Sequence, residues 1–456
     1  MAIPHESPNL IDRTFAGLLA AWQSLIKNRQ GDVTDFEPNL PESEHETLKS
    51  LMTACLQRQG GEVAARARAA TLGNAYLRLN SEGKRQFLHI LANEFDTDFE
   101  AIKACATSLI QDQEYNQEAV EAQLRTLLTP PYMHLLTQFN ALPQGVKFLV
   151  DLRADLLSFQ AEDPTLMRMA DLLKLQLTSW FDIGFLELKS ITWEAPASLL
   201  EKLISYEAVH EIKSWADLKN RLSSDRRCFA FFHPRMPEEP LIFVQVALVD
   251  TLSDNIQSIL DESAPKQDTR QANTAIFYSI SNTQVGLQGV SLGNFLIKRV
   301  VDSLSRDYPN LKTFSTLSPI PGFGRYLKKR LDTPPPSDTE NMRQLAEQLQ
   351  QKDWHLNEPL CEALKIPLMQ HCAHYLVNEK KGHRAYDPVA NFHLNNGARL
   401  ARINWLGDTS SKGLQESFGL MVNYVYELAE INQNHERYRA NGEVVTSKVV
   451  RSLLSE

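Results

Sequence analysis

The residues most suggestive of chemistry stand in a glycine-rich stretch between an apolar run and an amphipathic one. Residues 279–293 read Ser-Ile-Ser-Asn-Thr-Gln-Val-Gly-Leu-Gln-Gly-Val-Ser-Leu-Gly, with glycines at positions 286, 289 and 293. Glycine lets a backbone turn tightly and approach a ligand, and the N–H groups that begin a helix point towards anionic oxygens. The stretch predicts a loop that cradles a pyrophosphate, although a tight turn with close helix packing would explain the glycines equally well.

The spacing of these glycines separates several kinds of phosphate site. It fits neither the GxGxxG pattern of dinucleotide-binding folds nor a Walker A loop, because no Gly-Lys-Ser or Gly-Lys-Thr follows. It looks like the acyl-CoA loop of the N-acetyltransferase fold, which also follows a strand and begins a helix. Basic residues that flank the site in sequence could meet phosphates or form an ordinary solvated face: Lys298, Arg299, Lys328, Lys329 and Arg330.

Positions 289–293 also match G-x-S-x-G, the nucleophile elbow of esterases and thioesterases. Such an elbow places its serine directly at a strand-to-helix turn. Here the apolar run ends near Ser281, about ten residues before Ser291, and no oxyanion motif of the HGGG type precedes it. The elbow is therefore the weaker interpretation of this segment.

Hydroxyl and imidazole groups follow in two further segments. In residues 314–323 a short apolar run stops at two prolines, and Ser315, Thr316 and Ser318 stand at its end. Hydroxyls in this position could hold a carboxylate or an enolate by hydrogen bonding, or could simply end the strand. His393 stands among polar and turn-forming residues, where it could donate a hydrogen bond or transfer a proton near neutral pH; a surface histidine is the alternative.

A metal site is the less favoured interpretation of the remaining histidines. Residues 371–374 read His-Cys-Ala-His, and thiolate and imidazole are both zinc ligands. The segment has the spacing of an amphipathic helix without a second ligand pair, so we expect packing and no metal. A reducing compartment is expected, because neither a disulfide framework nor a zinc ribbon is suggested by the scattered cysteines, Cys55, Cys105, Cys228, Cys361 and Cys372.

Two domains of different texture must position these groups. From about residue 10 to residue 179 the apolar positions recur at helical spacing, with breaks at Gly60-Gly61, Pro130-Pro131 and Pro143-Gln-Gly145. After Trp180, β-rich runs alternate with helices, at residues 228–233, 241–250, 274–281 and 313–317. We expect an α+β protein overall, in which an all-α helical bundle over residues 1–178 precedes an α/β domain over residues 179–456.

Composition limits the partners of the chain. The formal net charge of −9 and the pI near 5.8 argue against nucleic acid or an anionic membrane as the main partner. No apolar run approaches the roughly 18 residues of a membrane span. The N-terminus matches neither a secretory signal nor a transit peptide, and the C-terminus carries no peroxisomal tripeptide. We therefore expect a cytoplasmic protein.

The three segments, in this order, closely resemble malonyl-CoA decarboxylases. The resemblance covers essentially the whole region after Trp180. It implies an N-terminal helical domain used in oligomerisation and a C-terminal acetyltransferase-like domain that binds coenzyme A. Its motifs are long and specific: Ala-Ile-Phe-Tyr-Ser-Ile-Ser (275–281), Gly-Leu-Gln-Gly-Val (286–290), Phe-Leu-Ile-Lys-Arg-Val-Val (295–301), Leu-Ser-Pro-Ile-Pro-Gly-Phe (317–323), Pro-Val-Ala-Asn-Phe-His-Leu (388–394) and Arg-Ile-Asn-Trp (402–405).

The resemblance also implies roles for single residues. By position, the catalytic serine of the family falls on Ser315 and its catalytic histidine on His393. Ser318, three residues from Ser315, and Tyr426 are further candidates for the substrate pocket. The acyl-CoA is expected to contact the loop residues Val285, Gly286, Leu287, Gln288, Gly289, Val290 and Ser291.

The reaction implied by the resemblance converts malonyl-CoA to acetyl-CoA and CO2 through a thioester enolate. It needs no metal or prosthetic group, because the thioester itself delocalises the developing carbanion. A carboxylate leaves more readily when it is poorly solvated, so we expect an apolar wall beside it. A homotetramer is the assembly expected from the family. The alternatives are a CoA-dependent acetyltransferase, an acyl-CoA thioesterase and a non-catalytic acyl-CoA sensor.

Overall fold

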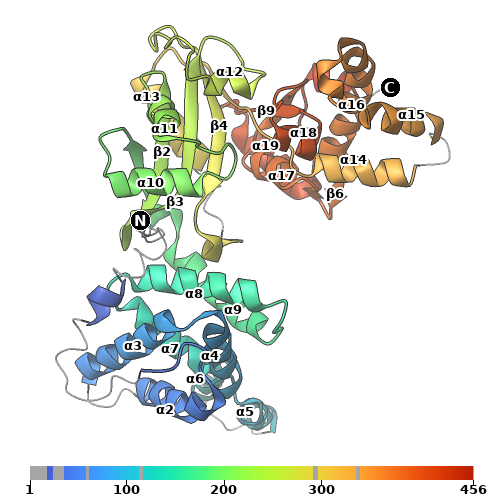
Figure 1. The fold of residues 1–456 in the computed structure, drawn as a ribbon. Helices are drawn as coiled ribbons and strands as arrows, with labels where there is room; N and C mark the ends of the chain where they lie inside the picture. Colours follow the sequence, from blue (N-terminus) through green and yellow to red (C-terminus); the bar gives the residue numbers. More distant parts are fainter. Residues whose placement is uncertain are drawn as a thin grey trace, which may run out of the picture. The chain divides into compact units, whose positions relative to one another are not determined.

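The computed structural model divides the chain into two compact units (Figure 1) and describes residues 18–23, 35–57, 61–111, 117–290, 296–334 and 339–454. The helical unit is the chain up to Phe185 together with two short later segments, His233–Pro237 and Gln284–Val290. The sheet unit comprises Leu186–Phe232, Glu238–Thr283 and Ser291–Glu456. The division expected from sequence, 1–178 and 179–456, did not place the two later segments in the helical unit.

The regular elements described in the helical unit before β1 are helices, as the spacing of apolar residues predicts. Each predicted break begins a helix, because α3 starts at Gly61, α7 at Pro131 and α8 at Gly145. A proline in the first turn of a helix costs no hydrogen bond, since that N–H has no partner within the helix. The main helices are α2 (His45–Leu56), α3 (Gly61–Arg78), α4 (Ser81–Glu94), α5 (Phe99–Gln111), α6 (Gln117–Leu127), α7 (Pro131–Asn140), α8 (Gly145–Phe159) and α9 (Leu166–Trp180).

Helix α8 lies at the centre of the aromatic core of this unit. The ring of Phe148 on α8 packs against Trp22 at 5.0 Å, Phe139 at 4.9 Å and Tyr76 at 5.7 Å between centroids. The indole N–H of Trp22 donates a hydrogen bond to the carbonyl of Pro143 at 2.8 Å, just before α8 begins. Buried aromatic side chains contribute large apolar areas to a core. Helix α8 is therefore firmly held.

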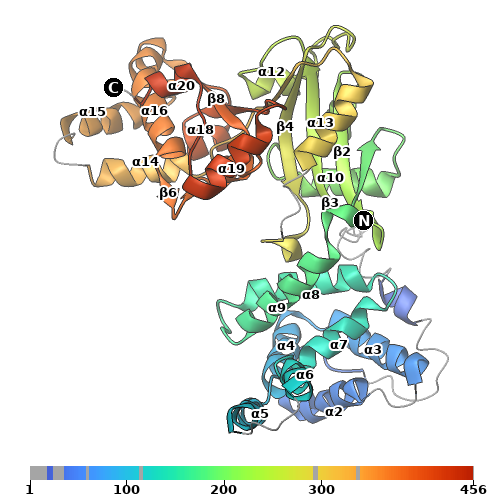
Figure 2. The ribbon, with the colours of Figure 1, turned by 180° about the vertical axis from the view of Figure 1, so that it is seen from behind.

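The sheet unit is built on a seven-stranded mixed sheet in the order β1-β2-β3-β4-β5-β9-β8. Helices α10 (Ala197–Tyr206) and α13 (Leu296–Asp307) lie on opposite faces of it, as two opposed views show (Figures 1 and 2). A parallel sheet pairing with a crossover helix agrees with the expected α/β domain. The strands are β1 (Glu187–Ile191), β2 (Arg226–His233), β3 (Met236–Val249), β4 (Thr274–Asn282), β5 (Thr313–Thr316), β8 (Arg399–Asn404) and β9 (Met421–Val425).

The parallel strands β4 and β5 pair over only part of their course. The pairing runs from Thr274 opposite Thr313 to Phe277 opposite Thr316. Beyond Phe277, β4 continues to Asn282, whereas the chain after β5 forms a bridge from Ser318 to Val422 on β9. The two strands therefore part beyond this pair.

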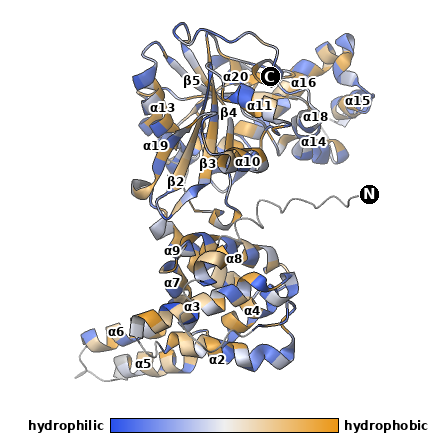
Figure 3. Cartoon of the chain, turned by 60° about the vertical axis from the view of Figure 1, so that its left-hand side comes forward, coloured by the Kyte–Doolittle hydropathy of each residue, from blue (hydrophilic) through white to orange (hydrophobic). Residues whose placement is uncertain are grey.

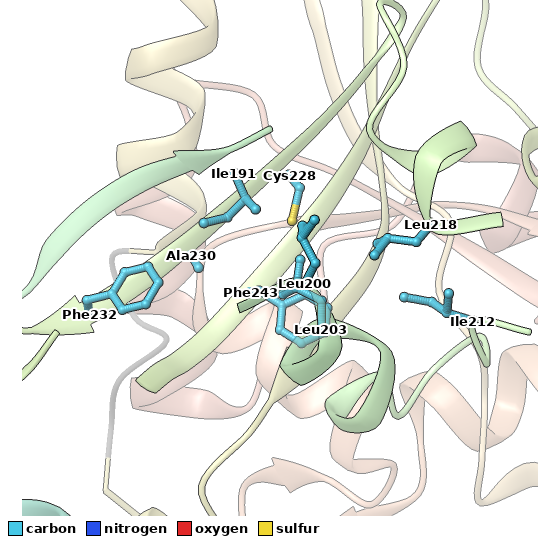
Figure 4. Close-up of a cluster of buried hydrophobic side chains, with 9 residues drawn as sticks. All are labelled: Ile191, Leu200, Leu203, Ile212, Leu218, Cys228, Ala230, Phe232 and Phe243. Atoms are coloured by element: carbon cyan, nitrogen blue, oxygen red, sulfur yellow. The ribbon is translucent and has the colours of Figure 1, made fainter. Parts of the chain in front are cut away.

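The remaining helices of this unit cover the sheet or extend beyond its β9–β8 end. One core cluster joins α10 and α11 (Trp215–Arg221) to the first strands (Figure 4): Ile191, Leu200, Leu203, Ile212, Leu218, Cys228, Ala230, Phe232 and Phe243. Hydrophobic residues run along strands β2 and β3 (Figure 3). The other elements are α12 (Ile256–Leu260), α14 (Phe323–Asp332), α15 (Thr339–Leu349), α16 (Glu358–Val377), β6 (Lys380–Lys381), β7 (Arg384–Ala385), α17 (Pro388–Asn395), α18 (Ser411–Ser417), α19 (Ile431–Asn441) and α20 (Lys448–Ser452).

Two sequence expectations concern the chain as a whole. The described cysteines are free thiols, and Cys55, Cys105, Cys228 and Cys372 are buried. Within the described ranges, no helix is both long enough and apolar enough to cross a membrane.

Candidate active site

His393 lies on helix α17, whose start is fixed by the local sequence. Asp387 caps this helix: its Oδ1 accepts hydrogen bonds from the backbone N–H groups of Val389 at 3.0 Å and Ala390 at 2.9 Å. Pro388 occupies the first turn, where its fixed φ favours a helix. A carboxylate cap and a proline in this order begin a helix strongly. The cap thereby determines where His393 lies.

The imidazole of His393 is buried, which excludes the alternative of a surface histidine. Its Nε2 lies 3.1 Å from Ser318 Oγ, and its Nδ1 lies 2.8 Å from the hydroxyl of Tyr426. The ring stacks on Tyr424 with 4.7 Å between centroids. The residue is 3 % exposed, and burial lowers the pKa of His393 to about 3. The imidazole is therefore neutral at physiological pH.

Hydroxyl groups extend this pair into a chain of hydrogen bonds. Burial raises the pKa of Tyr426, so its hydroxyl keeps its proton and can donate it to Nδ1 of His393. That arrangement leaves the imidazole proton on Nε2, facing Ser318. Ser318 Oγ donates to Thr316 Oγ1 at 2.8 Å, and this oxygen also accepts the backbone N–H of Tyr424 at 3.1 Å. Both nitrogen atoms of the imidazole thus have defined partners.

A cavity of about 350 Å³ opens beside Ser318 and His393 in the gap between β4 and β5. Its wall is mainly apolar, and no lysine, arginine, aspartate or glutamate contributes to the described lining. An apolar wall with a few convergent polar groups is typical of a small-molecule site. The lining residues are Val209, Phe277, Tyr278, Ser279, Ile280, Asn282, Leu317, Ser318, Pro319, Pro388, Val389, Phe392 and His393.

A carboxylate outside the lining holds one side of the cavity in place. Glu207 accepts hydrogen bonds from Ser279 Oγ at 2.8 Å, Ser281 Oγ at 3.2 Å and Gln245 Nε2 at 2.7 Å. The side-chain oxygen of Gln245 in turn accepts the hydroxyl of Tyr278 at 2.9 Å. Because these groups satisfy one another, Ser279 and Tyr278 present a fixed surface to the cavity.

Ser315 lies close to this site in sequence but makes different contacts. It stands on β5 opposite Val425 of β9 and is fully buried. Its Oγ donates to the backbone carbonyls of Thr316 at 3.1 Å and Tyr424 at 3.3 Å. The described side-chain partners of His393 are Ser318 and Tyr426, and Ser315 is absent from the described lining of the cavity.

The glycine-rich loop belongs to the helical unit, where it packs against α8. Residues Val285–Leu287 form a 3-10 turn, and a Cβ on Gly286 would lie 1.7 Å from the carbonyl oxygen of Val150. Only glycine fits such a close approach of two backbones. Gly289 has a φ of 78° and lies on the exposed side of the loop. Ser291 and Gly293 lie outside the described residues, and with them most of the G-x-S-x-G pattern at positions 289–293.

The His-Cys-Ala-His segment lies within α16. Cys372 is fully buried, and Nδ1 of His374 lies 3.3 Å from the hydroxyl of Tyr326. Across the described ranges, no group of three or more histidine, cysteine, aspartate or glutamate side chains could hold a metal ion.

Comparison with known proteins gives this arrangement its context. Family models described as the malonyl-CoA decarboxylase C-terminal domain and N-terminal domain match residues 184–456 and 95–181 respectively. The mitochondrial malonyl-CoA decarboxylase of Anser anser anser is 40% identical over 426 residues, which cover 86% of this chain and 84% of the relative. The chain belongs to the malonyl-CoA decarboxylase family. The mitochondrial enzyme of Rattus norvegicus is 41% identical over 404 residues, 82% of each chain.

Solved structures of malonyl-CoA decarboxylases share this fold. The crystal structure of the protein from Rhodopseudomonas palustris matches with a TM-score of 0.84 and 40% identity, and covers 90% of this chain and 99% of that one. That from Agrobacterium vitis matches with a TM-score of 0.83 and 40% identity over 90% and 100% of the two chains. The predicted order of a helical region before a mixed sheet is thereby confirmed.

Within the malonyl-CoA decarboxylase fold, sequence reasoning missed several residues that shape the site. Asp387 could have been found from the Asp-Pro pair that begins a helix. Glu207 could not, because its partners lie far away in the chain. Two of the flanking basic residues have partners within the protein: Arg299 donates to the carbonyl of Leu186 at 2.8 Å, and Arg330 donates to the hydroxyl of Tyr326 at 2.9 Å.

Proposed function

We propose that this chain decarboxylates malonyl-CoA to acetyl-CoA and CO2 through a thioester enolate. The observation that carries the proposal is a neutral, hydrogen-bonded His393 facing an apolar cavity together with Ser318. Membership of the malonyl-CoA decarboxylase family supports the choice of substrate. Of the alternative acyl-CoA reactions, a thioesterase would require a nucleophile for hydrolysis, and an acetyltransferase would require an amine acceptor.

The wall of the cavity suits the departure of CO2. Phe277, Leu317 and Phe392 offer no hydrogen bonds to a carboxylate, and the described lining contains no cation to stabilise it. A carboxylate transferred from water to such a surface is destabilised relative to neutral CO2. The C–C bond then breaks, and its electron pair moves into the thioester to form an enolate.

The neutral imidazole suits the stabilisation of that enolate. In the tautomer favoured by Tyr426, Nε2–H of His393 lies beside the cavity next to Ser318, and a bound enolate oxygen would accept it while Ser318 keeps its donation to Thr316. A neutral imidazole can stabilise a developing oxyanion without carrying a permanent charge, as it does in triosephosphate isomerase, a known example. We assign the proton that C2 of the acetyl group gains to the Ser318–His393 pair. Solvent then replaces this proton, so that one proton is consumed for each CO2 released.

Position in the family and the geometry of the site select different serines for catalysis. Position assigns catalysis to Ser315, whereas the contact with His393 and the cavity favours Ser318. We propose Ser318 as the catalytic serine and Tyr426 as a positioning residue that fixes the imidazole. Ser315 then supports β5 and β9 through its hydrogen bonds to backbone carbonyls.

One incubation tests the proposed activity. The purified chain is mixed with malonyl-CoA in EDTA, and the products are followed by mass spectrometry. Acetyl-CoA and CO2 are expected, because the proposed chemistry draws on the thioester and needs no metal or prosthetic group. Failure to form acetyl-CoA would refute the proposal; CoA with free malonate would favour a thioesterase, and acetylation of an added amine would favour a transferase. Tight binding without turnover would favour a sensor.

We also propose a homotetramer in the cytoplasm. The curated relatives named above are mitochondrial, so the compartment of this chain is a separate proposal. The family resemblance supports assembly through the helical unit, and several large apolar side chains are exposed on that unit. They include Phe99, Ile110, Leu128, Met167 and Leu175. Light scattering of the purified protein should give four times the chain mass of 51.7 kDa, and a monomer would contradict the proposal.

A further inference from the structure

We infer that the sheet unit carries a second ligand site, which binds a small organic anion that has an oxyanion head and an apolar body. The site is a cavity of about 550 Å³ between helices α14, α15 and α16 and the residues that follow α20. These three helices lie side by side in both opposed views (Figures 1 and 2). The described lining shares no residue with the cavity beside His393, so the site is separate from the one proposed for decarboxylation.

The polar part of the lining comes from two segments for which the proposed reaction has no use. Arg330 ends the basic run 328–330 on α14, and His371 and His374 begin and end the His-Cys-Ala-His segment on α16. All three side chains line the cavity, together with four side-chain amides, three from α15 and one from α16. No aspartate or glutamate contributes to the described lining. The cavity therefore carries a positive charge and many N–H donors.

The guanidinium of Arg330 lacks a counterion within the described part of the chain. Its Nη1 donates to the hydroxyl of Tyr326 at 2.9 Å, and its Cζ lies 5.7 Å from the centre of that ring. Its Nε is buried and has no hydrogen-bond partner among the described residues. The Tyr326 hydroxyl donates to Glu379 at 3.1 Å, but this carboxylate does not line the cavity. A charge withdrawn from water is stabilised by an ion of opposite sign, and a bound anion would supply it.

The size and the apolar part of the cavity define the rest of the ligand. Met342 and Leu345 of α15 are buried in its wall, and Leu453 and Leu454 line it from the end of α20. Its volume is in the range of sites for organic molecules, and an inorganic ion would leave the apolar wall uncovered. The fork of donors on Arg330 matches the oxygen atoms of a carboxylate or a phosphate equally. The ligand is therefore an organic carboxylate or phosphate.

Calorimetry of the full-length chain with three probes of equal length tests the chemistry of the ligand. Hexanoate, hexyl phosphate and hexanol share a six-carbon body and differ in the head. At least one of the two anions should bind, and hexanol should bind about 10-fold more weakly or not at all. Binding of hexanoate alone assigns a carboxylate ligand, and binding of hexyl phosphate alone assigns a phosphate. Equal affinity for hexanol would refute the recognition of an anion.

Charge variants on α14 locate the binding. Arg330→Gln should weaken binding of the anionic probe about 10-fold, because a charge-assisted contact is lost. Lys329→Gln is the matched control, since it removes the same charge from an exposed neighbouring position that does not line the cavity. Its affinity should equal that of the wild type. An unchanged affinity in Arg330→Gln, or an equal loss in both variants, would contradict the inference.

A substitution on α16 tests the same cavity without altering its cation. Ala363 lines the cavity from an exposed position, so Ala363→Trp should fill part of the space and leave the contact between Arg330 and Tyr326 in place. This variant should also bind the probe more weakly, and it keeps the test decisive if Arg330→Gln does not fold. Thermal melting shows which variants fold. Wild-type affinity in Ala363→Trp would place the probe outside this cavity.

A last variant separates the two cavities of the sheet unit. His393→Gln alters the cavity beside β4 and β5 and should bind the anionic probe as the wild type does. A loss of affinity in this variant would assign the probe to the active site and overturn the inference, as would a wild type that binds neither anion. The measurement uses no malonyl-CoA, so its outcome is independent of the proposed reaction.

Discussion

Ser318 and Ser315 differ in their partners although three residues separate them. Ser318→Ala removes the hydroxyl that contacts Nε2 of His393, so we expect kcat to fall on the order of 100-fold. Ser315→Ala removes hydrogen bonds to two backbone carbonyls, one of which also accepts the side chain of Asn423. Its kcat should fall by less than about 3-fold, with a small loss of thermal stability. Rates of acetyl-CoA formation by the two variants measure this, and the opposite ranking would return the catalytic role to Ser315.

The buried imidazole of His393 also predicts a dependence of stability on pH. Its pKa is lowered by burial to about 3, whereas in the unfolded chain it is about 6.5. Below pH 6.5 the unfolded state binds a proton that the folded state excludes, so stability is lost as the pH falls towards 3. His210, with a pKa lowered to about 4 chiefly by burial, acts in the same direction.

Thermal melting of the wild type and His393→Gln between pH 7.5 and 4.5 measures the contribution of His393. The melting temperature of the wild type should fall more steeply below pH 6.5, because the variant lacks this one titrating group while all others are shared. If the melting temperatures of the two proteins fall in parallel with pH, His393 titrates alike in the folded and unfolded states. Because the folded imidazole stays neutral, kcat of the wild type should not show a histidine transition between pH 6 and 8.

The candidate residues could be located from sequence more readily than their partners. The segments around His393 and Ser318 are conspicuous in the chain, Tyr426 follows from the family resemblance, and the structure brings these three side chains together. The choice between Ser315 and Ser318 depends on how the chain leaves β5 and bridges to Val422. That bridge is a contact with a much later strand, and no local pattern reports it.

At the scale of the element, the start of α17 connects local sequence to catalysis. Asp387→Ala removes the cap on the N–H groups of Val389 and Ala390 and should lower the free energy of unfolding by about 1–3 kcal/mol. It should also lower kcat, because the helix that carries His393 is no longer fixed. Chemical denaturation and steady-state rates measure the two effects.

Ser214→Ala is the matched control for this cap. Ser214 caps α11, where its Oγ accepts the N–H of Asp217 at 3.0 Å, and neither residue lines the cavity. This variant should lose about 1 kcal/mol of stability while kcat stays at the wild-type value. An equal change of kcat in the two variants would mean that capping affects catalysis only through general stability.

Elements with a strong local signal are those that the sequence predicts well. The breaks at Gly61, Pro131 and Gly145 begin helices because glycine and proline restrict the backbone locally. The apolar spacing of Leu296, Val300 and Leu304 predicts α13, and all three side chains are buried. The parting of β4 and β5, which creates the cavity, follows from the topology of the sheet and carries no such signal.

At the scale of the whole molecule, one segment packs with a different unit from its neighbours in sequence. Residues 284–290 follow β4 directly, so the sequence places them in the α/β domain. The structure groups them with the helical unit, because Arg153 bonds to carbonyls 133 and 135 residues later in the chain. Contacts of such separation are set by packing and leave no local pattern. The glycines predict a phosphate loop from local sequence alone, whereas the helix on which the loop packs could not be predicted from it.

Gly286 offers a test of that support. A Cβ at this position would meet the carbonyl oxygen of Val150 at 1.7 Å and its carbon at 2.6 Å, and backbone atoms of a buried helix cannot withdraw. Gly286→Ala must therefore lift the loop from α8 and weaken its bonds to Arg153. Gly184→Ala is the control within the same unit, since its Cβ meets only the side chain of Asp182 at 3.2 Å.

Coenzyme A added to the wild type at about 100 times its Kd should stabilise the folded state by about 2.7 kcal/mol. The resulting rise in melting temperature should be preserved in Gly184→Ala and largely lost in Gly286→Ala, together with a rise in KM for malonyl-CoA of about 10-fold or more. The chemistry at His393 uses residues of the sheet unit, so kcat at saturating substrate should change far less than KM. A Gly286→Ala variant that coenzyme A stabilises as fully as the wild type would show that seating the loop on α8 is not required for binding.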